Sequence, residues 1–127
     1  MPLVRISLLK GRPPGLGKKI GRIVYDSMVD TISVPEHDLF EIVTEHDGEG
    51  LIYDRSYLNI ARTDGFVIIQ ITLSEGRSID LKKNLYRTIA ERLHQQLAIR
   101  PEDVFINLVE VKKENWSFGN GIAQYVA

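Results

Sequence analysis

The residue best suited to acid-base chemistry is Pro2, which directly follows Met1. Methionine is normally removed in front of proline, and its removal would leave a secondary amine at the chain terminus. An α-amino group titrates at about 7.7 to 8.0 in model peptides; an apolar pocket lowers this pKa and nearby anions raise it. We therefore expect that Pro2 can act as a general acid or base near neutral pH. Many proteins begin with Met-Pro, however, and in a structural interpretation Pro2 only starts a strand.

Other familiar catalytic patterns are missing from the sequence. The chain has no cysteine, which excludes a disulfide framework, a thiolate nucleophile and a cysteine-ligated metal. Its histidines, His37, His46 and His94, do not have metal-ligand spacing. Neither a glycine-rich phosphate loop nor a serine in a nucleophile elbow is present. The sequence therefore predicts no metal and no cofactor.

The composition is that of an ordinary globular protein. With 127 residues, of which 43% are hydrophobic and 26% are charged, we expect a single domain over residues 1–127. The net charge is −1 and the basic residues are dispersed, so we expect neither a nucleic-acid nor a membrane partner. There is no run of 18 apolar residues and no convincing signal peptide, so we expect a cytoplasmic protein.

The order strand, helix, strand occurs twice along the chain. Strands are predicted at 2–9, 39–45, 66–73 and 104–111, and helices at 16–31 and 78–97. Residues 46–65 between the two units are expected to form a long connection that includes one short strand. The tail from Lys112 contains Trp116, the only tryptophan, beside Phe118, and such an aromatic tail is expected to pack against another surface.

A shift of 65 residues reveals an internal repeat. Residues 2–45 align without a gap on 67–110 and share ten identities, among them Arg12 with Arg77 and Asp38 with Asp103. Two β-α-β units predict an α/β fold with a four-stranded sheet and both helices on one face. We expect the other face to carry Val4, Ile42, Ile68 and Leu108, and to be covered by association with further copies.

Four segments, in the same order along most of the chain, resemble those of the tautomerase superfamily. They are the Met-Pro start, VPEHD at 34–38, SEGRS at 74–78 and WSFG at 116–119. The doubled unit is similar to the malonate semialdehyde decarboxylase branch. The resemblance implies that Pro2 is the acid/base residue, that Asp38 assists it, that Arg77 holds a substrate carboxylate, and that the protein is a trimer. Trp116 and Phe118 are expected to form a pocket wall or an interface, because neither side chain carries useful acid/base chemistry.

Alternatives remain for these roles. Asp38 and Arg77 have repeat mates, Asp103 and Arg12, so each could serve only its turn. The decarboxylase turn carries two arginines separated by one residue, whereas this chain has Glu75 at the first of those positions. The leading expectation is keto-enol tautomerisation of a small anionic 2-oxo or 3-oxo acid. The alternatives are a decarboxylase or hydratase and a noncatalytic binding or scaffold protein.

Overall fold

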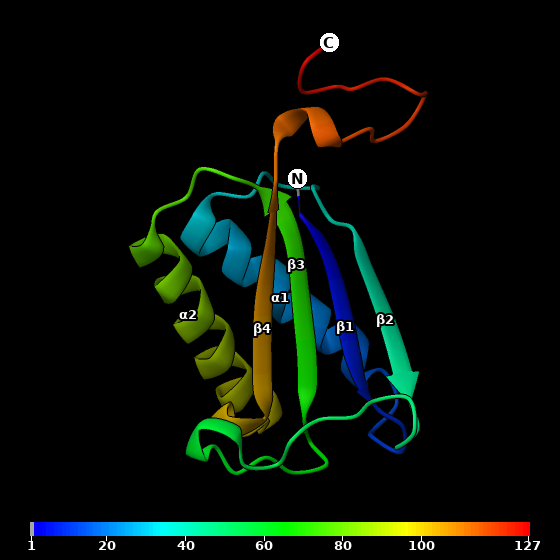
Figure 1. The fold of residues 1–127 in the computed structure, drawn as a ribbon, viewed down its shortest axis with the longest axis vertical. Coiled ribbons are helices and arrows are strands. Elements are labelled where there is room, and N and C mark those ends of the chain that lie inside the picture. The colour runs from blue at the N-terminus through cyan, green and yellow to red at the C-terminus, as the bar shows by residue number, and fades with distance from the viewer. Residues whose placement is uncertain (1) are drawn as a thin grey trace.

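A computed structural model describes residues 2–127 and contains two β-α-β units joined into one sheet. The units consist of β1 (Leu3–Leu9), α1 (Leu16–Ile32), β2 (Glu41–His46), then β3 (Val67–Ser74), α2 (Ile79–Leu97) and β4 (Val104–Val111). The strand order is β2-β1-β3-β4, with β1 parallel to β2, β3 parallel to β4, and β1 antiparallel to β3. Both helices cover the same face of the sheet (Figure 1). The expected fold and order of elements are confirmed.

The strand register is the same in both units. Val4 pairs with Glu41 and Val67 pairs with Val104, a separation of 37 residues in each unit. In the central antiparallel pair, Arg5 lies opposite Gln70, its mate at a shift of 65 residues. A duplicated unit would give this arrangement, with an approximate twofold axis between β1 and β3. The axis places the start of β1 at one end of the sheet and the start of β3 at the other.

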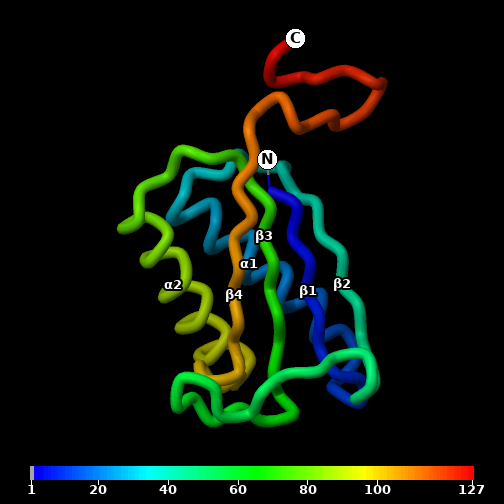
Figure 2. Tube along the Cα trace, viewed as in Figure 1, coloured from blue at the N-terminus to red at the C-terminus, as the bar shows by residue number. Residues whose placement is uncertain are grey.

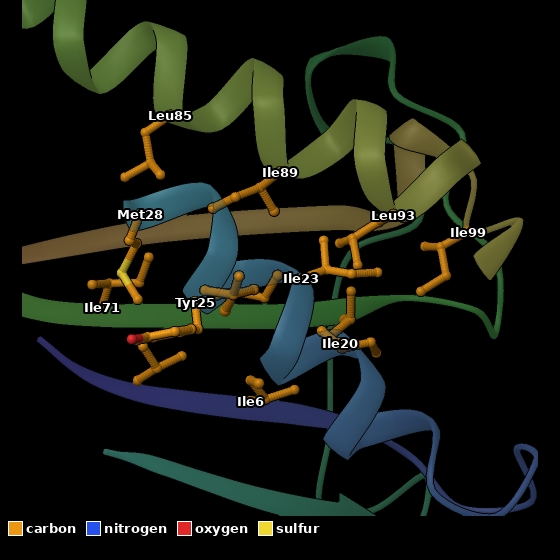
Figure 3. Packing of buried hydrophobic residues seen from close by; sticks show 14 of the residues in the cluster. Ile6, Ile20, Ile23, Tyr25, Met28, Ile71, Leu85, Ile89, Leu93 and Ile99 are labelled. Atoms are coloured by element: carbon orange, nitrogen blue, oxygen red, sulfur yellow. The ribbon is translucent and has the colours of Figure 1, made fainter. Parts of the chain in front are cut away.

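The hydrophobic core lies between the helices and the sheet. Each helix presents an apolar stripe at three- and four-residue spacing, and Leu85, Ile89 and Leu93 of α2 are fully buried. In Figure 3 Leu85 lies near Met28 of α1, and Leu93 lies near Ile23 of α1, so α2 packs along α1 in one cluster. No helix within residues 2–127 is long and apolar enough to cross a membrane. The cytoplasmic location expected from the sequence stays a prediction.

Of the four residues predicted on the open face of the sheet, two lie there and two face the helices instead. Val4 is fully buried in the core and Leu108 packs against it, so both face the helices. Ile42 is 40% exposed, and Ile68 follows the buried Val67 and so points to the open face. The error has a simple cause: in a strand with apolar residues on both sides, the inward face depends on register.

The two long irregular segments lie at opposite ends of the sheet. The connection after β2 contains a 3₁₀ turn at Tyr57–Asn59 and no strand between 47 and 66, so the short strand considered from the sequence was wrong. After β4, the tail forms a second short turn at Lys113–Asn115 and runs above the end where the chain starts (Figures 1 and 2). This position puts the tail aromatics close to Pro2.

Candidate active site

Pro2 is buried at the entry to β1 and lines a small cavity. The backbone nitrogen of Val4 donates to the carbonyl of Phe40 at 3.0 Å, so the start of β1 runs beside the segment that leads into β2. The cavity has a volume of about 210 Å³, and its other lining residues are Leu3, Phe40, Trp116, Ser117 and Phe118. The removal of Met1 concerns a residue outside the described range and stays a prediction.

Aromatic rings of the tail form the wall of this cavity. Trp116 and Phe118 stack with their centroids 5.4 Å apart and their planes 9° apart, and Phe118 also contacts Phe40 at 6.0 Å. Gln124 closes the tail into a loop, because its side chain accepts from the nitrogen of Phe118 and donates to the carbonyl of Gly119. The structure thus places Trp116 and Phe118 beside Pro2, and a role for them in binding stays a prediction.

The loop that carries Asp38 is fixed by α1. The backbone nitrogen of His37 donates to the hydroxyl of Tyr25 at 2.9 Å, and that tyrosine is buried in the core with 6% of its surface exposed. The nitrogen of Asp38 donates to the carbonyl of Pro35 at 3.2 Å. Asp38 is half-buried and lies two residues before Phe40. It lies at the Pro2 end of the sheet without lining the small cavity.

Arg77 follows β3 at the same end of the sheet and is half-buried. Its Nη1 donates to the carbonyl of Ser74 at 3.0 Å, and its Nη2 donates to the carbonyl of Ile32, the last residue of α1, at 3.4 Å. Burial lowers the pKa of the guanidinium, an effect that the carboxylate of Glu110 partly opposes. A partly desolvated cation gains more from an anionic ligand than a fully hydrated one does. Arg77 does not line the small cavity.

Ser74 connects Arg77 to the aromatic wall. Its hydroxyl accepts a hydrogen bond from Nε1 of Trp116 at 3.1 Å, while its carbonyl accepts from Arg77, and the residue is 3% exposed. The sequence did not single out this serine as a functional residue, nor Phe40. Phe40 is one of the repeated identities, and that repetition was the available signal. A serine at a strand end gives no comparable signal.

Glu75, the departure from the two-arginine pattern, is exposed. Its backbone nitrogen donates to the carbonyl of Val111 at 2.9 Å, which fixes the turn to the end of β4. The turn at 74–78 contains one arginine, Arg77, so the two-arginine pattern of the decarboxylase branch is not restored here.

The site is a small cavity with aromatic walls, and the turn that carries Arg77 lies at the same end of the sheet. Pro2 is its one lining residue that can offer an amine, and only as a chain terminus. Within residues 2–127 no group of three or more histidine, aspartate or glutamate side chains could hold a metal ion.

Comparisons with known proteins show which family the chain resembles along most of its length. A family model described as "Tautomerase enzyme" matches residues 38–119. The chain is 43% identical over 126 residues to "Probable tautomerase YusQ" of Bacillus subtilis (strain 168), with 99% of each chain covered. It is 34% identical to "Probable tautomerase YrdN" of the same organism, with 99% of this chain and 97% of the relative covered.

Solved structures give a consistent result. A malonate semialdehyde decarboxylase, FG41, inhibited by 3-bromopropiolate, shares 35% identity with a TM-score of 0.91, covering 98% of this chain and 94% of the other. A second malonate semialdehyde decarboxylase shares 28% identity with a TM-score of 0.89, covering 97% and 95%. A fused 4-OT, a symmetric trimer, shares 20% identity with a TM-score of 0.76 over 94% of each chain, which is a similarity of fold.

Proposed function

Because this chain belongs to the tautomerase family, in a branch resembling malonate semialdehyde decarboxylase, we propose that it moves a proton on a small 2-oxo or 3-oxo acid with Pro2 as the acid/base residue. The chain is an enzyme of that family, and the proposal concerns its site and substrate. The observation that carries the proposal is the burial of Pro2 against a cavity walled by Trp116 and Phe118.

In the proposed tautomerisation the amine of Pro2 is neutral at the start. An apolar, aromatic environment disfavours the ammonium form and so lowers the pKa of the amine. The amine takes a proton from the carbon next to the carbonyl, and the carbonyl oxygen gains electron density. The enol forms when the resulting ammonium of Pro2 gives that proton to the oxygen, which leaves the amine neutral again. The reverse path returns a proton from Pro2 to carbon. Arg77 holds the carboxylate of the substrate and Asp38 assists the amine.

Decarboxylation of a 3-oxo acid is the second candidate, favoured by the similarity to two malonate semialdehyde decarboxylases. In this reaction protonated Pro2 polarises the carbonyl, and the bond to the carboxylate breaks so that carbon dioxide leaves and its electron pair forms an enolate. The enolate then takes one proton from solvent on carbon and gives the aldehyde. The exposed Glu75 opposes a second anion at the turn. If this lyase activity is latent, Glu75→Arg is expected to raise carbon dioxide release from malonate semialdehyde.

We also propose that the protein is a homotrimer. The open sheet face carries Ile42, which is 40% exposed, Phe105 at 45% and Val109 at 38%, and such residues are usually covered by another chain. A solved relative with the same fold is a symmetric trimer. Mass measurement in solution tests this part of the proposal separately.

The experiment that tests Pro2 compares two proteins of verified intact mass, both lacking Met1. The wild type is expected to ketonise the enol of phenylpyruvate, and Pro2→Ala is expected to lose about 100-fold or more in kcat/KM, because general acid-base catalysis contributes about that much. Alanine keeps a terminal amine but makes it primary and more mobile. A matched control is Pro101→Ala, which changes a proline far from the cavity, at the start of the turn before β4.

Equal rates for wild type and Pro2→Ala would remove Pro2 from the mechanism. A wild type no faster than buffer on oxo acids of several sizes would favour a noncatalytic binding protein. A wild type that retains Met1 and yet keeps full activity would also contradict the proposal, since no terminal proline amine exists in that sample.

A further inference from the structure

A second and larger cavity lies at the end of the sheet opposite Pro2. Its volume is about 610 Å³, and its walls come from the ends of β1 and β2 and from the connection that follows β2. In Figure 2 these segments meet at the end of the molecule away from both chain termini. The residues that carry the argument below are Lys10, Arg12, His46, Leu51, Tyr53 and Arg55.

Two cations in this cavity make no direct ion pair. Lys10 and Arg12 line it, and within residues 2–127 neither side chain makes an ion pair or hydrogen bond. The third cation of the lining, Arg55, is paired with Asp64. Asp47 also lines the cavity, and its Oδ1 accepts two backbone hydrogen bonds, from the nitrogens of residues 49 and 50. The lining thus carries three cations and two carboxylates, which leaves one net positive charge with His46 neutral.

A buried imidazole nitrogen in the lining also lacks a partner. Nε2 of His46 is inaccessible to solvent, and no group within the described part of the chain forms a hydrogen bond with it. Buried polar atoms are nearly always hydrogen-bonded, so Nε2 is an unsatisfied polar atom within the wall of the cavity. Apolar surface is available nearby from Leu9, Leu51 and Ile52.

The repeat relates the turn after β1, which lines this cavity, to the turn after β3. Arg12 is the mate of Arg77 and Lys10 is the mate of Glu75, so the turn after β1 carries two cations separated by one residue. Tyr53 of this lining stacks on Phe66 with centroids 4.1 Å apart. The mate of Pro2 is Val67, an internal residue that has no free amine.

We propose that this cavity is a second binding site, specific for a small organic oxyanion with an apolar body, which it binds without turning it over. Lys10 and Arg12 hold the oxyanion, and the leucine and isoleucine side chains contact the body of the ligand. Carboxylates and phosphonates share the chemistry that this pair of cations recognises. The site stands on its own geometry and does not depend on the function proposed for Pro2.

Calorimetry with 3-phenylpropionate, and separately with phenylphosphonate, tests the proposal. The fluorescence of Trp116, the only tryptophan, reports binding in the Pro2 cavity. The heat measured by calorimetry reports binding at every site. Lys10→Gln/Arg12→Gln is expected to weaken the calorimetric site that Trp116 does not report by about tenfold or more, because charge-assisted hydrogen bonds are lost. Its Trp116 titration is expected to stay unchanged.

The matched control is Lys18→Gln/Lys19→Gln, which removes two exposed charges of α1 outside the cavity and is expected to bind like wild type. If the heat arises only from the site that Trp116 reports, or if the Lys10/Arg12 variant binds both oxyanions like wild type, the proposal is wrong. If the Pro2 cavity binds neither probe, the fluorescence of Trp116 does not change, and calorimetry still detects binding at the second site. The neutral 3-phenylpropionamide is expected not to bind there, and equal binding of acid and amide would also overturn the proposal.

Discussion

At the Pro2 end of the sheet the aromatic tail closes over a small cavity, whereas at the opposite end the connection after β2 leaves a cavity about three times larger. Arg77 at the first end uses its guanidinium to bind the carbonyls of Ser74 and Ile32. Its repeat mate Arg12 has no such partner within residues 2–127. The two repeated turns therefore differ in the hydrogen bonding of their arginines: Arg77 is held by two carbonyls, and Arg12 is not.

The comparison separates what the backbone repeats from what it does not. Cation-bearing turns after β1 and β3 come with the β-α-β unit, so both ends of the sheet carry a cation, and both proposals of anion binding use one. A terminal amine can exist only where the chain starts, and the position equivalent to Pro2 is Val67. We infer that binding is the general property of this unit and that proton transfer belongs to one end of it.

The largest expected effect concerns the two arginines. Arg77→Ala is expected to raise KM for a 2-oxo acid by about 10- to 100-fold and to change KM little for the corresponding amide, since only the acid loses a charge-assisted pair. Arg12→Ala, the repeat mate, is expected to leave both values within about twofold. Steady-state kinetics with both substrates measures the difference between the two ends.

Stability must be measured beside these kinetics, because Arg77 also joins the end of α1 to the end of β3. Arg77→Lys keeps the charge but loses the bidentate geometry, so its KM is expected to lie between those of wild type and Arg77→Ala. If Arg77→Ala weakened the acid and the amide equally, with an unchanged melting temperature, the arginine would serve its turn only, and the two ends would be alike in this respect.

Much of this contrast could be read from the sequence, and the rest could not for physical reasons. The periodicity of Leu85, Ile89 and Leu93 predicted the second helix, and the repeat predicted the sheet. The pocket around Pro2 needed the path of the tail, which local pattern does not determine. The cavity beside Lys10 and Arg12 needed the path of residues 47–55, an irregular segment without periodicity.

A second prediction compares the aspartates that precede β2 and β4. Asp103 is 1% exposed, and its two carboxylate oxygens accept from the nitrogen and the hydroxyl of Thr63 at 2.7 and 2.6 Å. Asp103→Ala is expected to lower the free energy of unfolding by about 2 to 3 kcal/mol and to leave kcat nearly unchanged. Urea unfolding and turnover measure the two effects.

Asp38→Ala is the matched variant at the Pro2 end, where the proposed role is catalytic. It is expected to lower kcat more than stability, the reverse of Asp103→Ala. If both variants lose stability to the same extent and Asp38→Ala keeps full turnover, the two aspartates have one structural role, repeated with the unit.

The smallest expected effect concerns Glu41 on the helix-facing side of β2, where the second unit has Ile106. Within the described residues, Oε2 of Glu41 is buried without a hydrogen-bond partner. A Cβ on Gly21 would lie within 3 Å of its carboxylate, so the glycine makes room for this side chain. Burial raises the pKa of Glu41, and the nearby Arg22 partly opposes this shift.

The sign of the pH dependence follows from a folded-state pKa above the unfolded one. Below the unfolded value the carboxyl is protonated in both states, so burial of Glu41 has no ionisation cost; above the folded value the whole cost is present. Glu41→Gln keeps the shape and removes the charge. It is expected to raise the free energy of unfolding by about 1 kcal/mol or less at pH 7 and to match wild type near pH 3.5. Urea unfolding at both pH values measures this. A Glu41→Gln protein that is less stable than wild type at pH 7, but not at pH 3.5, would contradict this prediction. It would mean that the attraction of the Glu41 carboxylate to Arg22 exceeds the cost of burying it.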